Sequence, residues 1–227
     1  NIAELFRGMN PVISTNGHYL DRESCLSLAG SSLKKIIVSY DGITPDVYSI
    51  YRRGGDHSLV TEGIRSLSAA IRERKSRLKV VLQFLLHRRN EHEVRAAAAF
   101  AASVGAEFRI KSMQLLDPER AGEWMPADSR RARYPVNGGG ARPAGRTPSA
   151  GCLRMWTSAV ITADGDVVPC CYDKNAGHPM GNLANSTFLD IWRGEEYRIF
   201  RERVMSDRRL IDICSNCPQG KSLFFRR

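Results

Sequence analysis

The chain has 227 residues, of which 42% are hydrophobic, and this content is sufficient for a packed core. Disorder is therefore not expected. No stretch approaches the run of about 18 apolar residues that a membrane helix needs, and the first residues lack the charged and apolar regions of a secretory signal. We predict a soluble, cytoplasmic protein.

The net charge of +10 suggests nucleic acid as a partner at first sight. However, the basic residues are spread over the stretch 65–77 and a loop at 130–146, without interleaved aromatic residues. This distribution predicts a solvated basic surface and makes nucleic acid an unexpected partner. An acidic or phosphorylated substrate is the alternative.

Short apolar runs alternate with helical patterns in the first half of the chain, which is typical of βαβ units and a parallel sheet. Four βα repeats of this kind supply only the later part of a six-stranded partial barrel. The strands are expected at 11–14, 35–39, 79–86 and 107–111.

Three helical stretches separate these strands. Asp21 is a plausible N-cap for a helix that runs to Ala29. The stretch 46–76 contains Gly54 and Gly55 and is expected to form two helices. Asn90 with Glu93 three positions later resembles a capping box that opens the next helix.

Prolines and a triple glycine interrupt every periodicity between 117 and 151, so we place a domain boundary there. After it, Asp164-Gly165 predicts a hairpin between strands at 158–162 and 167–171. Ser186 is expected to cap a helix that ends before Asp207.

Six cysteines are too few for a disulfide scaffold in a chain of this length, which indicates a reducing compartment. Four of them, Cys152, Cys170, Cys214 and Cys217, have the spacing of a metal site, with a Cys-x-x-Cys pair at the end. Four thiolates bind either tetrahedral zinc or an iron–sulfur cluster, and the spacing does not decide between them.

The sequence contains two further cysteines, Cys171 and Cys25. Cys170 and Cys171 are adjacent, and neighbouring residues of a strand point to opposite faces, so one of the two is a ligand and the other packs. Cys25 lies on a predicted helix far from the others in sequence, where a buried cysteine acts as a small hydrophobic residue.

The pattern Cys-x12-Gly-x4-Cys ending in Cys-x-x-Cys resembles the SPASM domain of radical S-adenosylmethionine (SAM) enzymes, in its shorter twitch form. The strings 13–17, 37–42 and 48–55 are similar to the third and fourth strand regions of radical SAM barrels. The resemblance implies an α/β fold: a partial parallel (β/α)6-type barrel at 1–116, a linker at 117–151 and a small α+β twitch domain at 152–227.

The resemblance also implies ligands and roles. The four cysteines would hold one auxiliary 4Fe-4S cluster, with Cys170 rather than Cys171 as the second ligand. Ligands bind at the carboxyl ends of barrel strands. The residues expected to contact SAM there are Thr15, Asn16, Ser39, Asp41, Arg52 and Gln83, of which Asn16-Gly17 and Asp41-Gly42 are alternatively ordinary turns.

Lys111 and Gln114 follow the last strand and are expected to contact the substrate. Asp173, close to the auxiliary cysteines, is expected to act as a general base, or alternatively to cap the hairpin as a turn residue. The Cys-x-x-x-Cys-x-x-Cys loop that holds the SAM-cleaving 4Fe-4S cluster in the family is not in this sequence. We expect it before Asn1, where the chain opens on what resembles the last turns of a helix.

The family transfers one electron from a reducing partner such as flavodoxin or ferredoxin to SAM. The resulting 5′-deoxyadenosyl radical abstracts a hydrogen atom from the substrate, and the auxiliary cluster accepts an electron. The resemblance therefore implies an oxidoreductase-type enzyme, for which a small polyol or sugar-like substrate is favoured. A maturase that modifies a peptide and a zinc-stapled interaction module without catalysis are the alternatives.

Overall fold

The computed structural model describes residues 8–115, 117–134, 150–215 and 217. The chain divides into two compact units, Asn1–Ala141 and Arg142–Arg227, and each is described by itself. This division falls within the predicted linker. Among the helices described, none combines the length and the apolar character needed to cross a bilayer.

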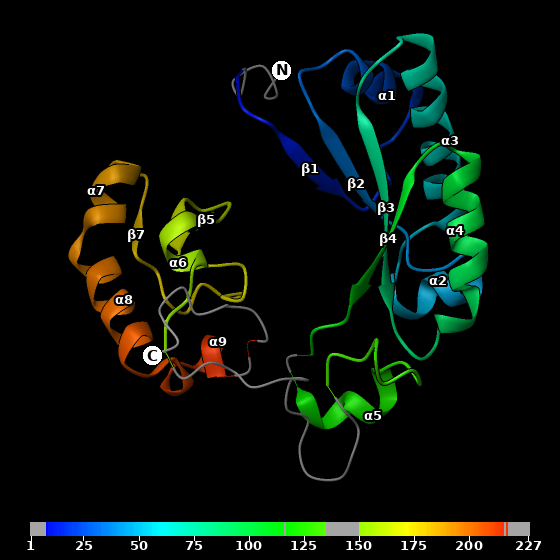
Figure 1. The fold of residues 1–227 in the computed structure, drawn as a ribbon. Coiled ribbons are helices and arrows are strands. Elements are labelled where there is room, and N and C mark those ends of the chain that lie inside the picture. Colours follow the sequence, from blue (N-terminus) through cyan, green and yellow to red (C-terminus); the bar gives the residue numbers. More distant parts are fainter. Residues whose placement is uncertain (1–7, 116, 135–149, 216, 218–227) are drawn as a thin grey trace, which may run out of the picture. The chain divides into compact units, whose positions relative to one another are not determined.

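Unit 1 contains a parallel sheet in the order β1-β2-β3-β4 (Figure 1). The sequence predicts the two central strands to the residue, the first strand shifted by one residue at both ends, and the last strand one residue too short. The strands are β1 (Val12–Thr15), β2 (Lys35–Ser39), β3 (Lys79–Leu86) and β4 (Glu107–Ser112).

Helices pack on one face of this sheet and bury its main core. Ile36 and Val38 of β2 and Leu82 of β3 are fully or almost fully buried there. The predicted break in the stretch 46–76 is confirmed, because a short and a long helix lie on either side of the two glycines. The helices are α1 (Arg22–Ala29), α2 (Pro45–Tyr51), α3 (His57–Glu73) and α4 (Val94–Ser103).

The opposite face of the sheet carries the residues of alternate positions. In the parallel register Ser39 pairs with Gln83, and Gln83 pairs with Arg109. These three polar side chains therefore form one row across three strands. The sheet is the confirmed part of the predicted fold, and its closure into a barrel stays a prediction.

In unit 1 the predicted cap at Asp21 is confirmed, and the predicted capping box at Asn90 and Glu93 is wrong. Asp21 accepts a hydrogen bond from the Ser24 amide at 2.7 Å at the start of α1. Asn90 precedes a 3-10 turn, η2 (Glu91–Glu93), which ends at Glu93, and the Asn90 side chain makes no capping bond there. Tertiary contacts take both side chains instead: the Asn90 amide donates to the Asp41 and Leu85 carbonyls, and Glu93 accepts from Thr44.

The first part of the predicted linker folds with unit 1. The 3-10 turn η3 (Pro118–Arg120) and helix α5 (Ala121–Trp124) follow the sheet. Met125 and Tyr134 are buried with Leu85 of β3 in a second core cluster. The rest of the predicted linker, 135–149, lies outside the described residues, as does the predicted helix end at 1–7.

Unit 2 opens with a short helix, α6 (Arg154–Thr157), and a small antiparallel sheet in the order β5-β6-β7. The predicted hairpin is confirmed, with Gly165 in its turn at a φ of +86°, a backbone conformation that favours glycine. Its strands are shorter than predicted, and the third strand was missed. The strands are β5 (Val160–Ile161), β6 (Asp166–Val168) and β7 (Gly181–Asn182).

The predicted helix after Ser186 is two helices, and its cap was misplaced by one residue. Thr187, not Ser186, accepts from the Asp190 amide, and Gly194 separates the two helices. The second of them includes Asp207. The remaining elements are α7 (Phe188–Arg193), α8 (Glu195–Asp207), the 3-10 turn η4 (Arg208–Leu210) and α9 (Asp212–Ser215).

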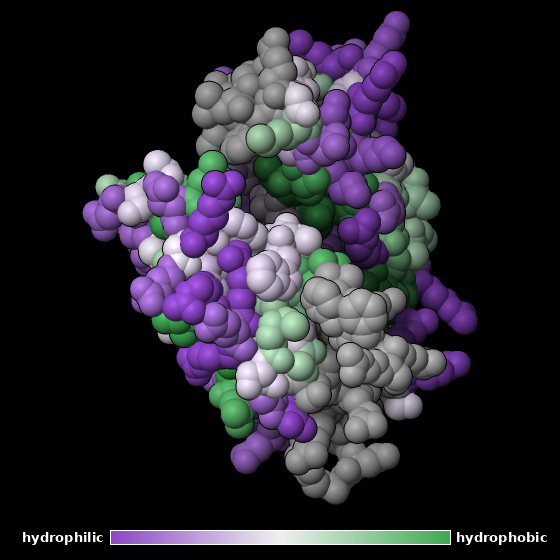
Figure 2. All heavy atoms as spheres, turned by 60° about the vertical axis from the view of Figure 1, so that its left-hand side comes forward, coloured by the Kyte–Doolittle hydropathy of each residue, from purple (hydrophilic) through white to green (hydrophobic). Residues whose placement is uncertain are grey.

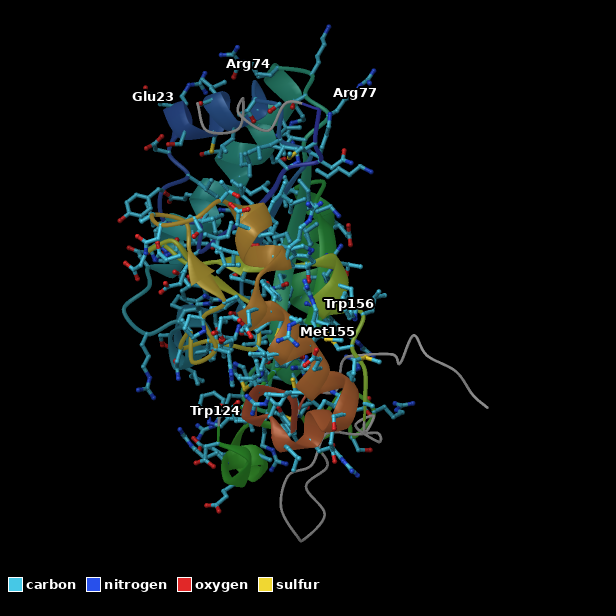
Figure 3. The ribbon with its side chains drawn as sticks, turned by 90° about the vertical axis from the view of Figure 1, so that its left-hand side faces the viewer. Glu23, Arg74, Arg77, Trp124, Met155 and Trp156 are labelled. Carbon is cyan, nitrogen blue, oxygen red and sulfur yellow. The ribbon has the colours of Figure 1, made fainter. Side chains whose placement is uncertain are left out.

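The basic side chains at the end of α3 are exposed. Arg74 and Arg77 project away from the protein there (Figure 3), and Lys75 between them is also exposed. Hydrophilic side chains are likewise prominent on the face in Figure 2. This part of the charge forms the solvated surface that the sequence predicts.

Candidate functional site

The four predicted ligand cysteines all lie in unit 2. Cys152 precedes α6, Cys170 follows β6, and Cys214 belongs to α9. Cys214 and Cys217 are buried, and the Cys217 amide donates to the Cys214 carbonyl at 3.1 Å. Cys152 packs against the core cluster that contains Cys214. Residues from the two ends of the unit are thereby brought together.

The four thiols are also close enough to influence one another electrostatically. Burial raises the pKa of Cys214 to about 12, and Cys170, Cys217 and Cys152 add to this increase as neighbouring thiols. Burial likewise raises the pKa of Cys170, with further contributions from the Cys171 and Cys217 thiols. Without a metal the Cys170 and Cys214 thiols stay protonated, so iron binding at them must displace their protons.

The donor set fits an iron–sulfur cluster, because four cysteine thiols are the ligands that such clusters use. Among the residues described, no three His, Cys, Asp or Glu side chains are close enough to hold one metal ion. The fit of this site to a cluster therefore rests on the type of its donors and on their shared neighbourhood.

The structure separates the two adjacent cysteines. Cys170 is half-buried beside the other thiols, whereas Cys171 is exposed and accepts a hydrogen bond from Arg154 Nη1 at 3.3 Å. Both follow β6 rather than lying in it, so the strand alternation expected for them was wrong. The geometry nevertheless favours Cys170 as the ligand.

Cys25 has the packing role that the sequence predicts. Its side chain is fully buried in the main core of unit 1, and its Sγ lies 3.5 Å from the Leu20 carbonyl oxygen. Burial raises the pKa of Cys25 to about 11. This cysteine is a buried neutral thiol.

Asp173 has the geometry of a turn residue. Its two carboxylate oxygens accept hydrogen bonds from the Gly177 and His178 amides, at 2.8 and 2.9 Å. The carboxylate is therefore occupied by the backbone and is nearly buried. This arrangement matches the alternative role given to Asp173, and its role as a general base stays a prediction.

A buried arginine in an aromatic cage lies in the same unit and was not predicted. The guanidinium carbon of Arg201 lies 4.5 Å from the ring centroids of Trp192 and Tyr197 and 4.7 Å from that of Trp156. Figure 3 labels Trp156 on α6. Such cation–π contacts stabilise a unit with a small core.

The strand-end residues of unit 1 form more than one group. Ser39 and Gln83 lie in the polar row on the face opposite the helices, together with Arg109, which was not predicted. Lys111 follows two positions later on the same face of β4, and Gln114 comes just after that strand. The alternation of Arg109 and Lys111 along the strand was the signal available in the sequence.

Asp41 and Arg52 form a buried ion pair. Asp41 is fully buried, its Oδ2 lies 2.6 Å from Arg52 Nε, and its Oδ1 accepts from the Leu85 amide at 2.7 Å. Burial raises the pKa of Asp41, and the Arg52 charge opposes this increase. Both carboxylate oxygens thus link β2 to β3 and to the end of α2. Contact of this pair with SAM stays a prediction.

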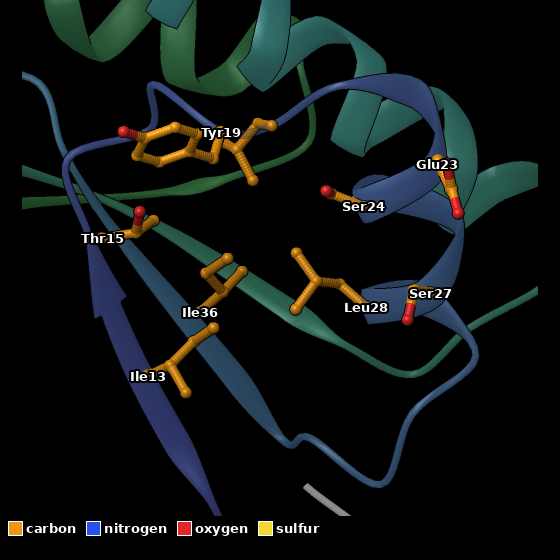
Figure 4. Close-up of a pocket in the computed structure, with 9 residues that line it drawn as sticks. Ile13, Thr15, Tyr19, Glu23, Ser24, Ser27, Leu28 and Ile36 are labelled. Carbon is orange, nitrogen blue, oxygen red and sulfur yellow. The ribbon is translucent and has the colours of Figure 1, made fainter. Parts of the chain in front are cut away.

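Thr15 lies on the other face of the sheet from that row. Thr15 pairs with Val38, so its side chain is on the helix-covered face, where it lines a pocket of about 430 Å³ under α1 with Ile13 and Leu28 (Figure 4). The Thr15 hydroxyl accepts from the Gly17 amide and Asn16 Oδ1 from the His18 amide, as in an ordinary turn. The structure therefore places the Thr15 side chain on the other face of the sheet from Ser39, and contact of Thr15 or Asn16 with SAM stays a prediction.

An aromatic cluster follows the end of β3. The His87 ring lies 5.4 Å from the Trp124 ring and 6.0 Å from the Tyr51 ring, and the histidine is fully buried. Burial, with a smaller contribution from Arg89, lowers the pKa of His87 to about 4. His87 is therefore neutral at physiological pH.

Residues 152–218 match the SPASM family, an iron–sulfur cluster-binding domain. This match covers the four cysteines that the structure gathers in unit 2. Residues 152–218, which make up less than a third of the chain, are thus similar to a SPASM domain. The predicted resemblance is confirmed for this domain, and the match favours iron over zinc at its cysteines.

A curated relative agrees with the SPASM match. The chain is 32% identical over 76 residues to the S-adenosyl-L-methionine-dependent 2-deoxy-scyllo-inosamine dehydrogenase of Niallia circulans. The aligned part is 33% of this chain and 30% of the relative. The chain thus aligns with less than a third of the length of this relative.

Solved structures of Streptococcus suis SuiB share the fold. The SuiB structure has a TM-score of 0.57 and 12% sequence identity, over 86% of this chain and 51% of SuiB. SuiB bound to its precursor peptide SuiA has the same score and identity, over 94% and 55%. At this identity the likeness concerns the fold alone.

Proposed function

We propose that this chain belongs to a radical SAM/SPASM oxidoreductase in which the SPASM domain holds one auxiliary 4Fe-4S cluster. The single observation that carries the proposal is the grouping of Cys152, Cys170, Cys214 and Cys217 within a segment that matches the SPASM family. When bound, SAM with its cluster supplies hydrogen-atom abstraction, and the auxiliary cluster supplies an electron acceptor.

The residues of the chain bind and orient the reactants in this proposal. Ser39 and Gln83 donate hydrogen bonds to SAM from the polar face of the sheet. Lys111 and Gln114, at the end of β4, contact the substrate. Asp41 and Arg52 hold the ends of β2 and β3 in place, so they help to position Ser39 and Gln83.

A small polyol or aminocyclitol is the favoured substrate class. The named activity of the curated relative, which acts on 2-deoxy-scyllo-inosamine, supports this class. A peptide substrate is the second candidate, because the fold is shared with SuiB in its complex with a precursor peptide. The relative has the higher sequence identity to this chain, and we therefore rank the aminocyclitol first.

The test uses protein produced from its natural reading frame, purified anaerobically and loaded with iron and sulfide. With SAM and dithionite we expect release of 5′-deoxyadenosine, and we expect 2-deoxy-scyllo-inosamine to increase that release. No release by iron-loaded protein contradicts the enzyme proposal. Release without any effect of the cyclitol contradicts only the substrate class.

A further inference from the structure

Arg208 is a buried arginine beside two of the proposed ligands. It begins η4 and is 1% exposed. Its Nη1 donates to the carbonyl oxygen of Gly151 at 3.1 Å, and Gly151 is the residue before Cys152. On the other side, the Arg208 carbonyl accepts from the Ile211 amide, and the Ile211 carbonyl accepts from the Cys214 amide at 2.9 Å. The arginine thus links the segments that carry Cys152 and Cys214.

The guanidinium is buried next to the segment that carries Cys152. The Ile211 amide donates a hydrogen bond to the Arg208 carbonyl, and Ile211 belongs to the same buried cluster as Cys214. The guanidinium therefore influences the thiols from within the core, where water screens a charge little.

A cation at this position has a defined effect on a cluster. Four thiolates give a bound 4Fe-4S cluster a net negative charge, and one-electron reduction makes that charge more negative. A nearby buried cation stabilises the reduced form more than the oxidised form. The reduction potential of the cluster is consequently raised.

We infer that Arg208 is a positioning residue that raises the reduction potential of the auxiliary cluster and so equips it to accept an electron. This inference rests on the proposed function, since it needs a cluster at the four cysteines. It assigns a functional reason for burying a guanidinium in a core that otherwise gains little from a charge.

The experiment is a spectroelectrochemical titration of the anaerobically reconstituted chain. Arg208→Gln removes the charge, and Arg208→Lys keeps it. Arg209→Gln is the matched control, because Arg209 is the next residue, exposed and paired with Asp207 at 2.6 Å. At a fixed ambient potential we expect Arg208→Gln to lower the ratio of reduced to oxidised cluster about tenfold, which corresponds to about 59 mV for one electron. The other two variants should stay close to wild type.

The possible outcomes separate the inference from the proposed function. Wild-type protein that binds no cluster overturns the proposed function itself. A cluster whose potential is the same in Arg208→Gln, or shifts equally in Arg209→Gln, overturns the inference alone. If Arg208→Gln loses iron, Arg208→Lys decides: retained iron with a wild-type potential supports the inference, and loss of iron there as well assigns Arg208 to folding only.

Discussion

Replacing Asp41 separates a structural role from a SAM-binding role. Asp41→Ala removes two charge-assisted contacts, to the Leu85 amide at 2.7 Å and to Arg52 Nε at 2.6 Å. Breaking a buried ion pair on one side costs about 3–5 kcal/mol. The Arg52 side chain is 26% exposed and recovers part of this cost by hydration, so we expect a loss near the lower end of that range.

Hydrogen–deuterium exchange measures this loss in unit 1 alone. We expect peptides that cover β2 and β3 to lose protection in Asp41→Ala, and about half as much in Asp41→Asn, which keeps an acceptor for the Leu85 amide. Glu107→Gln is the control, because its pair with Arg109 is exposed and adds little to stability. Unchanged protection in Asp41→Ala, together with weaker SAM binding, would refute the structural role.

Three further predictions concern single side chains. Because the folded chain binds a proton at His87 only near pH 4 and the unfolded chain near 6.5, this residue should remove up to about 3 kcal/mol of stability as the pH falls through that range. His87→Phe should abolish this share of the pH dependence in urea unfolding, and an unaltered pH profile would contradict it. Ser39→Ala should weaken SAM binding by about 1 kcal/mol in calorimetry. Thr15→Val, on the other face of the sheet, should leave that binding unchanged, and equal losses would argue against the polar row. Arg201→Met should lower the urea midpoint of unit 2, followed by Trp192 fluorescence, by the equivalent of about 2 kcal/mol. An unchanged midpoint would show that the cage adds nothing.

The regular elements were predictable where the sequence pattern agrees with the tertiary structure. The run 80–86 is apolar on both sides of the sheet except at Gln83, and all of it lies in one strand. The capping box failed because local spacing does not show competition from distant groups. Asn90 and Glu93 have the residue types of a cap, but the ends of β2 and β3 use their side chains.

Some residues of the candidate site could be predicted from the sequence, and others could not. Cysteine spacing predicts the proposed ligand set, because a Cys-x-x-Cys turn and a hairpin are local features. Arg208 gave no signal, since its contact with Gly151 joins residues 57 positions apart. Thr15 was grouped with Ser39 because both end a strand, but the register places their side chains on opposite faces.

Iron analysis of two cysteine variants tests the central claim most directly. We expect the anaerobically reconstituted chain to bind about four irons and four sulfides, as a single 4Fe-4S cluster requires. Cys171→Ala should retain them, because that thiol is exposed and lies against Arg154, whereas Cys170→Ala should lose them together with much of the stability of unit 2. Stoichiometric zinc in protein prepared with ample iron, or equal iron loss in the two variants, would contradict the account.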